Sequence, residues 1–185
     1  MTDDVIADLK QQMEQTLVAM RRDLSRTRTG RASTALLEGI TVEYYGSRTP
    51  LNQLASLNAP EARLLVLQPY DKSAMHEIER AILQSDLGLV PINDGKLIRI
   101  PIPELTEERR RDLVRHVRKL AEEYRVSVRN HRRDAIAMLK DLEKEKAITE
   151  DDLRRGQERV EELTKEHIAR VDKVLKAKED EIMEV

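Results

Sequence analysis

The sequence of 185 residues contains no cysteine, no tryptophan and no phenylalanine, so tyrosine is its only aromatic amino acid. The absence of cysteine excludes disulfide bonds, thiolate catalysis and cysteine-ligated zinc, and it fits a reducing compartment. Because aromatic residues make up only 2% of the chain, a large aromatic core is excluded. Helices packed by leucine, valine, isoleucine and alanine are favoured instead.

Long hydrophobic runs are also missing. No run of about 18 apolar residues occurs in the chain, so we expect no membrane-spanning segment and no association with membranes. The sequence starts with the acidic stretch Met1–Asp4 and continues as an amphipathic segment, which is not the pattern of a signal peptide. We therefore expect a cytoplasmic protein.

The chain also has no overall basic charge, since its formal net charge is -2. The charged residues are unevenly distributed along the sequence, however. Residues 106–133 hold ten Lys/Arg against five Asp/Glu, and residues 18–31 hold five Arg against one Asp. Residues 143–185 hold ten Lys/Arg against fourteen Asp/Glu, so an acidic segment offsets two basic ones.

Helical periodicity dominates both ends of the chain. Apolar residues recur every three or four positions through residues 5–24, 113–142 and 153–182, which predicts one-sided amphipathic helices. The first helix is expected to end near Thr29 and Gly30. The second should start after Thr106 as N-cap and run for about 40 residues, and the third should start at a capping box, Thr149–Asp152.

The segment between these helices has a different character. Strands are predicted at Thr41–Tyr45, Leu64–Leu67 and Leu97–Ile100, and a helix at Lys72–Ser85. The expected fold class is therefore α+β: an elongated three-helix bundle of residues 1–30 and 104–185, with a small α/β sandwich of residues 31–103 inserted into it. The connections near Gly30 and near Pro101 and Pro103 should act as a hinge.

Arginine forms a stripe on the second long helix. At about 100° per residue, the basic residues fall in one window beside the apolar face, with Glu122 as the interruption and few acidic residues four positions away. The stripe comprises Arg111, Arg115, Arg118, Arg125, Arg129, Arg132 and Arg133. Guanidinium groups suit phosphates, whereas solvated charge is the ordinary explanation for isolated pairs. Because tryptophan and phenylalanine are absent, the stripe favours folded RNA recognised by its backbone and shape.

A second basic cluster lies at the end of the first helix. It comprises Arg21, Arg22, Arg26, Arg28 and Arg31. Basic residues at a helix C-terminus are also explained by the helix dipole, so RNA binding and simple dipole stabilisation both stay open for this cluster.

Enzyme signatures are not found. The sequence has no glycine-rich phosphate loop, no dinucleotide-binding glycine pattern and no zinc-protease motif. His131 and His167 lie on the apolar stripes, where packing explains a histidine better than catalysis or metal binding does. We expect no enzymatic activity, no metal site and no cofactor.

Six segments of the sequence resemble the bacterial ribosome recycling factor family, and the match extends over both modules and the full length. They are Arg28–Ser33, Val42–Gly46, Pro50–Ser56, Ser85–Leu89, Leu105–Arg110 and Val128–Ala135. The departures are few. Thr34 stands where the family usually has proline, Val90 replaces a customary asparagine, and His131 replaces an aliphatic residue.

The resemblance implies an L-shaped protein that binds the post-termination ribosome between its subunits. The bundle is implied to contact large-subunit ribosomal RNA, while elongation factor G and GTP drive dissociation of the subunits and release of mRNA and deacylated tRNA. By motif, the implied RNA-binding residues are Arg28, Arg31, Arg110, Arg129, Arg132 and Arg133. Gly30, Pro101 and Pro103 are the implied hinge, and a monomer is expected in solution.

An alternative from a different class is a helical scaffold or chaperone-like protein that holds other proteins along its bundle. That function requires exposed apolar patches, and the sequence offers few apolar residues beyond those that the core needs. Loss of ribosome association after nuclease treatment would favour RNA binding over the scaffold.

Overall fold

The computed structural model describes residues 1–27 and 29–184. The chain divides into two compact units, one formed by Met1–Leu24 and Arg111–Val185 and the other by Ser25–Arg110. The boundaries expected near residues 30 and 103 both lie several residues inside the second unit.

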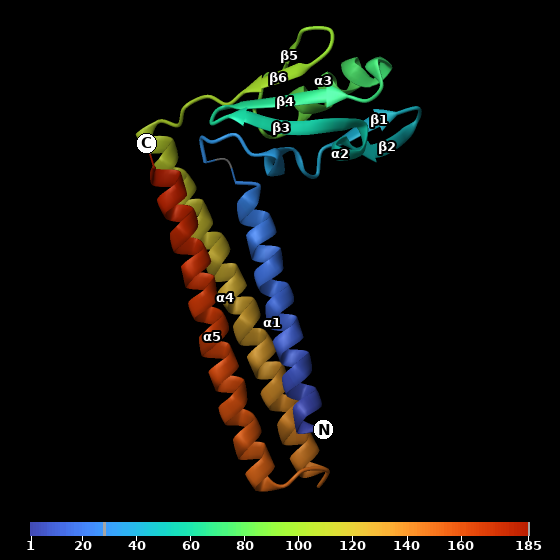
Figure 1. Ribbon diagram of the computed structural model, residues 1–185. Coiled ribbons are helices and arrows are strands. Elements are labelled where there is room, and N and C mark those ends of the chain that lie inside the picture. Colours follow the sequence, from blue (N-terminus) through green and yellow to red (C-terminus); the bar gives the residue numbers. More distant parts are fainter. Residues whose placement is uncertain (28, 185) are drawn as a thin grey trace. The chain divides into compact units, whose positions relative to one another are not determined.

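The first unit is a bundle in which α1 (Thr2–Ser25), α4 (Glu107–Lys144) and α5 (Glu150–Met183) run side by side (Figure 1). Their apolar stripes meet in a core where Met13, Leu139 and Val160 are fully buried. Burying these stripes is what stabilises helices of such high charge, because intrinsic helix propensity alone contributes little. No helix among residues 1–27 and 29–184 is apolar over a length that would cross a bilayer.

The turn between α4 and α5 confirms the predicted capping box. The Thr149 hydroxyl accepts a hydrogen bond from the Asp152 backbone N–H at 3.1 Å, and the Asp152 carboxylate accepts one from the Thr149 backbone N–H at 3.1 Å. Two backbone donors at the start of α5 are thereby satisfied, and the acidic first turn complements the helix dipole.

Two predictions about the bundle were wrong in detail. Helix α1 ends at Ser25 rather than near Gly30, because β-branched threonines follow and Gly30 adopts a left-handed φ of 82°. On α4, the apolar repeat of residues 113–142 includes Met138 and so predicts that it is buried, but Met138 is 57% exposed, whereas Leu139 is fully buried. A straight helix drifts away from a 3.5-residue repeat along its length, which shifts the core-facing position by one residue.

The second unit packs helix α3 against an antiparallel sheet with strand order β3-β4-β6-β5, beside the hairpin β1-β2. The strands are β1 (Thr41–Tyr44), β2 (Ser47–Pro50), β3 (Ala55–Glu61), β4 (Leu64–Pro69), β5 (Ile92–Asn93) and β6 (Ile98–Pro101). The helical elements are η1 (Thr34–Leu37), α2 (Leu51–Leu54), η2 (Lys72–Ala74) and α3 (Met75–Gln84). Leu65, Ile78 and Ile98 are fully buried between the layers.

The predicted α+β class and the principal elements of this unit are confirmed. The helix expected at Lys72–Ser85 begins with a 3₁₀ turn, and the Asp71 carboxylate caps it by accepting from the Ser73 backbone N–H at 2.9 Å. Strands β2, β3 and β5 were not predicted. Their residues are mostly polar and exposed, so they lack the apolar alternation that identifies a strand in a sequence.

The bundle also contains polar contacts that tie α1 to its neighbours. His167 is fully buried, and its ring nitrogens lie 2.7 Å from the Leu163 carbonyl oxygen and 3.1 Å from the Glu14 carboxylate. Arg170 donates two hydrogen bonds to the same Glu14 carboxylate. His131 contacts the Thr16 hydroxyl at 3.1 Å. Both histidines are thus partnered within the packed bundle.

We expect the Glu14 contacts to make the bundle sensitive to acid. The Arg170 guanidinium, and to a smaller extent His167, lower the Glu14 pKa from 4.5 to about 2 against the opposing effect of burial. A carboxylate with a lowered folded-state pKa stabilises the fold above its unfolded pKa, and this stabilisation is lost as pH falls through the folded value. Between pH 4.5 and 2 the wild-type melting temperature should therefore fall more than that of Glu14→Gln. Circular dichroism measures the melting temperature of both proteins at each pH. An equal fall in melting temperature for the two proteins would contradict this prediction.

Candidate nucleic-acid interface on helix α4

The arginines of α4 lie beside the face that packs into the bundle. Leu113, Val117 and Val128 are buried on the core face, and no glycine or proline interrupts the helix between Glu107 and Lys144. The seven predicted stripe positions therefore share one continuous helical surface, as the periodicity indicated.

Helix α5 supplies acidic partners to three arginines that are spaced seven residues apart on α4. Arg118 pairs with Glu179 at 2.6 Å, and Arg125 pairs with Asp172 at 2.6 Å. One further step of seven residues along α4, Arg132 lies 3.9 Å from Glu161. The helices are antiparallel (Figure 1), so one row of arginines faces a row of carboxylates from the neighbouring helix.

Glu122 supplies a further negative charge within the stripe. Its carboxylate accepts from Arg129 at 2.9 Å and from Arg125 at 3.0 Å. The hydrogen bonds from Arg129 and Arg125 lower the pKa of Glu122. The sequence-based description of an almost purely basic face was therefore incomplete, because several guanidinium groups are engaged in ion pairs.

The predicted residues near the middle of α4 differ in how firmly they are held. Arg129 is 42% exposed and bound to Glu122, whereas Arg132 is 33% exposed and only loosely paired with Glu161. Arg133 is exposed, and its guanidinium donates to the neutral amide oxygen of Asn130. Solvent-exposed ion pairs contribute little free energy, so Arg129 and Arg132 can exchange a carboxylate for a phosphate at low cost.

The remaining predicted RNA-binding residues belong to the other unit or lie outside the described residues. Arg28 is not among the residues that the structure describes. Arg31 is exposed, and Arg110 is half-buried in the first turn of α4. The RNA-binding role of all six arginines stays a prediction.

The predicted hinge residues all fall within the unit of residues 25–110. Pro101 ends strand β6, where it pairs with Leu64, and the Ile102 backbone N–H donates to the Arg63 carbonyl oxygen at 2.8 Å. Gly30 has a left-handed φ of 82°, a conformation that favours glycine. Residues 102–106 lie outside helices and strands. The hinge itself also stays a prediction.

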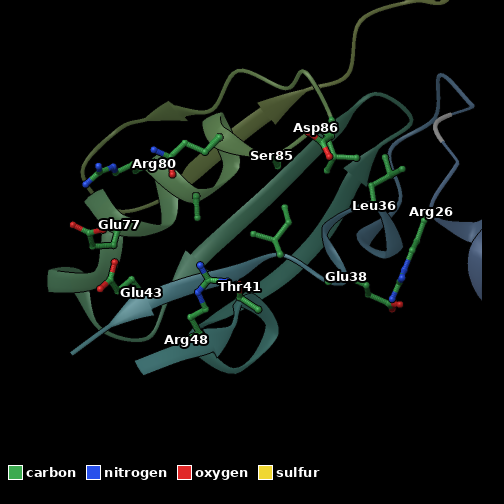
Figure 2. A pocket seen from close by; sticks show the side chains of 15 residues that line it. Arg26, Leu36, Glu38, Thr41, Glu43, Arg48, Glu77, Arg80, Ser85 and Asp86 are labelled. Carbon is green, nitrogen blue, oxygen red and sulfur yellow. The ribbon is translucent and has the colours of Figure 1, made fainter. Parts of the chain in front are cut away.

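A hollow of about 570 Å³ lies in the same unit. It is bordered by β1, β2 and α3, and Figure 2 shows the side chains that line it. Its charged lining residues are Arg26, Arg48, Arg80, Glu38, Glu43, Glu77 and Asp86. Because both signs of charge line the hollow, it lacks the basic character expected of a phosphate site. Within residues 1–27 and 29–184, no group of three or more metal-ligating side chains is assembled.

Sequence reasoning found the arginines but missed their carboxylate partners. The signal was present as the acidic excess of residues 143–185, which was treated as a bulk offset of charge. Only the antiparallel register of α4 and α5 shows that Glu161, Asp172 and Glu179 face the stripe.

Comparison with known proteins gives a consistent family. The model of the ribosome recycling factor family matches residues 20–183. The chain is 56% identical over 185 residues to the ribosome-recycling factor of Bacillus subtilis and 57% identical to that of Halalkalibacterium halodurans, with 100% of each chain covered. It is 52% identical over 183 residues to that of Oleidesulfovibrio alaskensis, covering 99% of this chain and 100% of the relative.

Solved structures agree with the sequence comparisons. A solution structure of the ribosome recycling factor is 42% identical with a TM-score of 0.79, covering 100% of this chain and 98% of the other. A second, at 46% identity with a TM-score of 0.68 and 100% of both chains covered, is the T. thermophilus ribosome recycling factor described with E. coli elongation factor G on the E. coli post-termination complex. With relatives above 50% identity over the full length, the chain belongs to the ribosome recycling factor family.

Proposed function

We propose that this chain binds the post-termination ribosome between its subunits and, together with elongation factor G and GTP, promotes their dissociation. In this proposal mRNA and deacylated tRNA leave as the subunits part. The protein acts as a monomer in the cytoplasm and uses no cofactor. It catalyses no reaction itself, and elongation factor G is the component that hydrolyses GTP. Membership of a family of translation factors supports this function.

The observation that carries the proposed mode of binding is the arginine stripe on the rigid helix α4. Ribosomal RNA presents phosphates in fixed positions, and arginines on one helical surface can meet several of them without ordering a flexible loop. In the proposed interface Arg129, Arg132 and Arg133 of α4 contact large-subunit RNA. Arg28, Arg31 and Arg110 provide further contacts, and the segments at Gly30, Pro101 and Pro103 allow the smaller unit to move.

Ribosome dissociation followed by light scattering tests the function. Post-termination complexes mixed with elongation factor G, GTP and an anti-association factor should lose scattering faster when this protein is added. The acceleration should disappear when elongation factor G or GTP is left out. Equal rates with and without the protein, in the complete mixture, would contradict the proposal.

A further inference from the structure

Helix α4 exposes an apolar side chain beside the arginines that are proposed to contact RNA. Among the residues that the structure describes, the exposed large apolar side chains of this helix are Val126, at 45%, and Met138, at 57%. Twelve positions along a helix correspond to a rotation of about 120°, so the two side chains lie on different faces. Val126 precedes Arg129 by three positions, which places it next to the arginine stripe.

The neighbours of Val126 differ in charge between its two sides. On the C-terminal side, Arg129 follows by three positions and Arg133 by seven. On the N-terminal side, Glu122 and Glu123 precede it by four and three positions. Residues at these spacings are neighbours on a helix surface. A phosphate is therefore favoured on the C-terminal side of Val126, where the guanidinium groups lie.

Neither helix propensity nor core packing accounts for a valine at this position. β-branched valine is less favourable than alanine in a helix, and a side chain that is 45% exposed realises only part of its burial energy. A single exposed apolar side chain is common on protein surfaces, and Val18 of α1, at 62%, is an example in the same unit. What distinguishes Val126 is its place beside the proposed RNA contacts.

The chemistry of the RNA backbone suits such an arrangement. Charged phosphates alternate along the strand with riboses, whose carbon-bound hydrogens form an apolar surface. Side chains three positions apart on a helix have Cβ atoms about 5–6 Å apart, so Val126 can reach the ribose next to a phosphate that Arg129 holds. Valine has no hydrogen-bonding group in its side chain, so this contact reads the backbone and its shape rather than the base.

We propose that Val126 packs against a ribose of the large-subunit RNA, next to a phosphate bound by Arg129. The inference rests on the proposed function and adds an uncharged contact to an interface that is otherwise described by its charges. A β-branched side chain in a helix has one strongly preferred χ1 rotamer. Little side-chain entropy is therefore lost when Val126 is covered by RNA.

The affinity of Val126→Ala and its salt dependence test the proposal. Binding to the large ribosomal subunit should weaken by about five- to tenfold, because two methyl groups lose their contact. The slope of log affinity against log salt should not change, since no phosphate contact is lost and counterion release stays the same. The melting temperature should change little, because the better helix propensity of alanine offsets the lost burial. Val126→Ile keeps the branched apolar surface and should retain most of the affinity.

Hydroxyl-radical footprinting identifies the ribose directly, because these radicals attack the carbon-bound hydrogens of the sugar. At saturating protein, a ribose of the large-subunit RNA that the wild type protects should become reactive with Val126→Ala. The protection pattern elsewhere on the RNA should stay the same. A weaker affinity without any change in ribose reactivity would show that Val126 contacts a ribosomal protein, and it would overturn the proposal.

Val18→Ala is the matched control, because Val18 is an exposed valine of the same unit that also precedes two arginines, Arg21 and Arg22. These two are not among the proposed RNA contacts, so this variant should bind like the wild type. An unchanged affinity of Val126→Ala, a changed salt slope, or an equal loss of affinity in Val18→Ala would each overturn the proposal. A wild-type protein that does not bind the large subunit would instead refute the proposed function.

Discussion

Replacing Arg129, Arg132 and Arg133 together by alanine should weaken binding to the large ribosomal subunit by roughly 1000-fold or more, because each charge-assisted hydrogen bond contributes about 1.5–3 kcal/mol. The salt dependence should change in a characteristic way. Each lost phosphate contact lowers the slope of log affinity against log salt by about 1. Binding measured by pelleting over a series of salt concentrations gives both quantities.

The acidic partners found in the structure sharpen this experiment. Glu161→Gln removes the carboxylate that lies 3.9 Å from Arg132, so this variant should bind somewhat more tightly than the wild type. Arg132→Ala alone should weaken binding and flatten the salt slope. The matched control replaces Arg154, Arg155 and Arg159 of α5, which are exposed and paired with carboxylates on their own helix. An equal loss of binding in the control would show that net charge, and not the α4 stripe, determines affinity.

Gly156→Val should destabilise the bundle by about 1–3 kcal/mol. Gly156 is buried on α5, and a Cβ at this position would lie 2.9 Å from Leu139 Cδ1 and 3.2 Å from Thr2 Cγ2. Leu139 is fully buried, so its side chain has little space into which it can move. Thermal or urea unfolding followed by circular dichroism measures the loss.

The direction of this effect distinguishes packing from helix propensity. Glycine inside a helix is less favourable than most residues, so at an exposed position its replacement would stabilise the helix. The control is Ala169→Val at an exposed position of α5, which should change stability by less than about 0.7 kcal/mol. Equal stability of Gly156→Val and wild type would mean that α1 and α4 do not approach α5 closely at this point.

Much of the bundle could be predicted because its signals are local in sequence. The apolar spacing of α1, α4 and α5, and the capping box of Thr149 and Asp152, depend on residues within a few positions of one another. Where the prediction failed, the cause acts over a longer stretch of chain. A straight helix drifts away from a 3.5-residue repeat, so far along α4 the core position passes from Met138 to Leu139.

The smaller unit was harder to predict for a related reason. Strands β3 and β5 are edge strands that owe their conformation to pairing with β4 and β6. Their own residues lack a period of two, so the pattern alone does not identify them. Tyr45 is a clearer case, because it lies in the turn between β1 and β2 with a left-handed φ of 47°, and this conformation can be recognised only in the folded hairpin.

The sequence by itself determined that arginines gather on one side of a long helix, because helical geometry converts spacing along the chain into position around an axis. Only the tertiary structure decided which of these charges are neutralised. Arg118 and Arg125 meet acidic residues 61 and 47 positions away, and such pairs arise only when two antiparallel helices pack in a particular register. Coulombic interactions depend on distance in space. Side chains that are far apart in sequence come close enough to interact only when the chain folds.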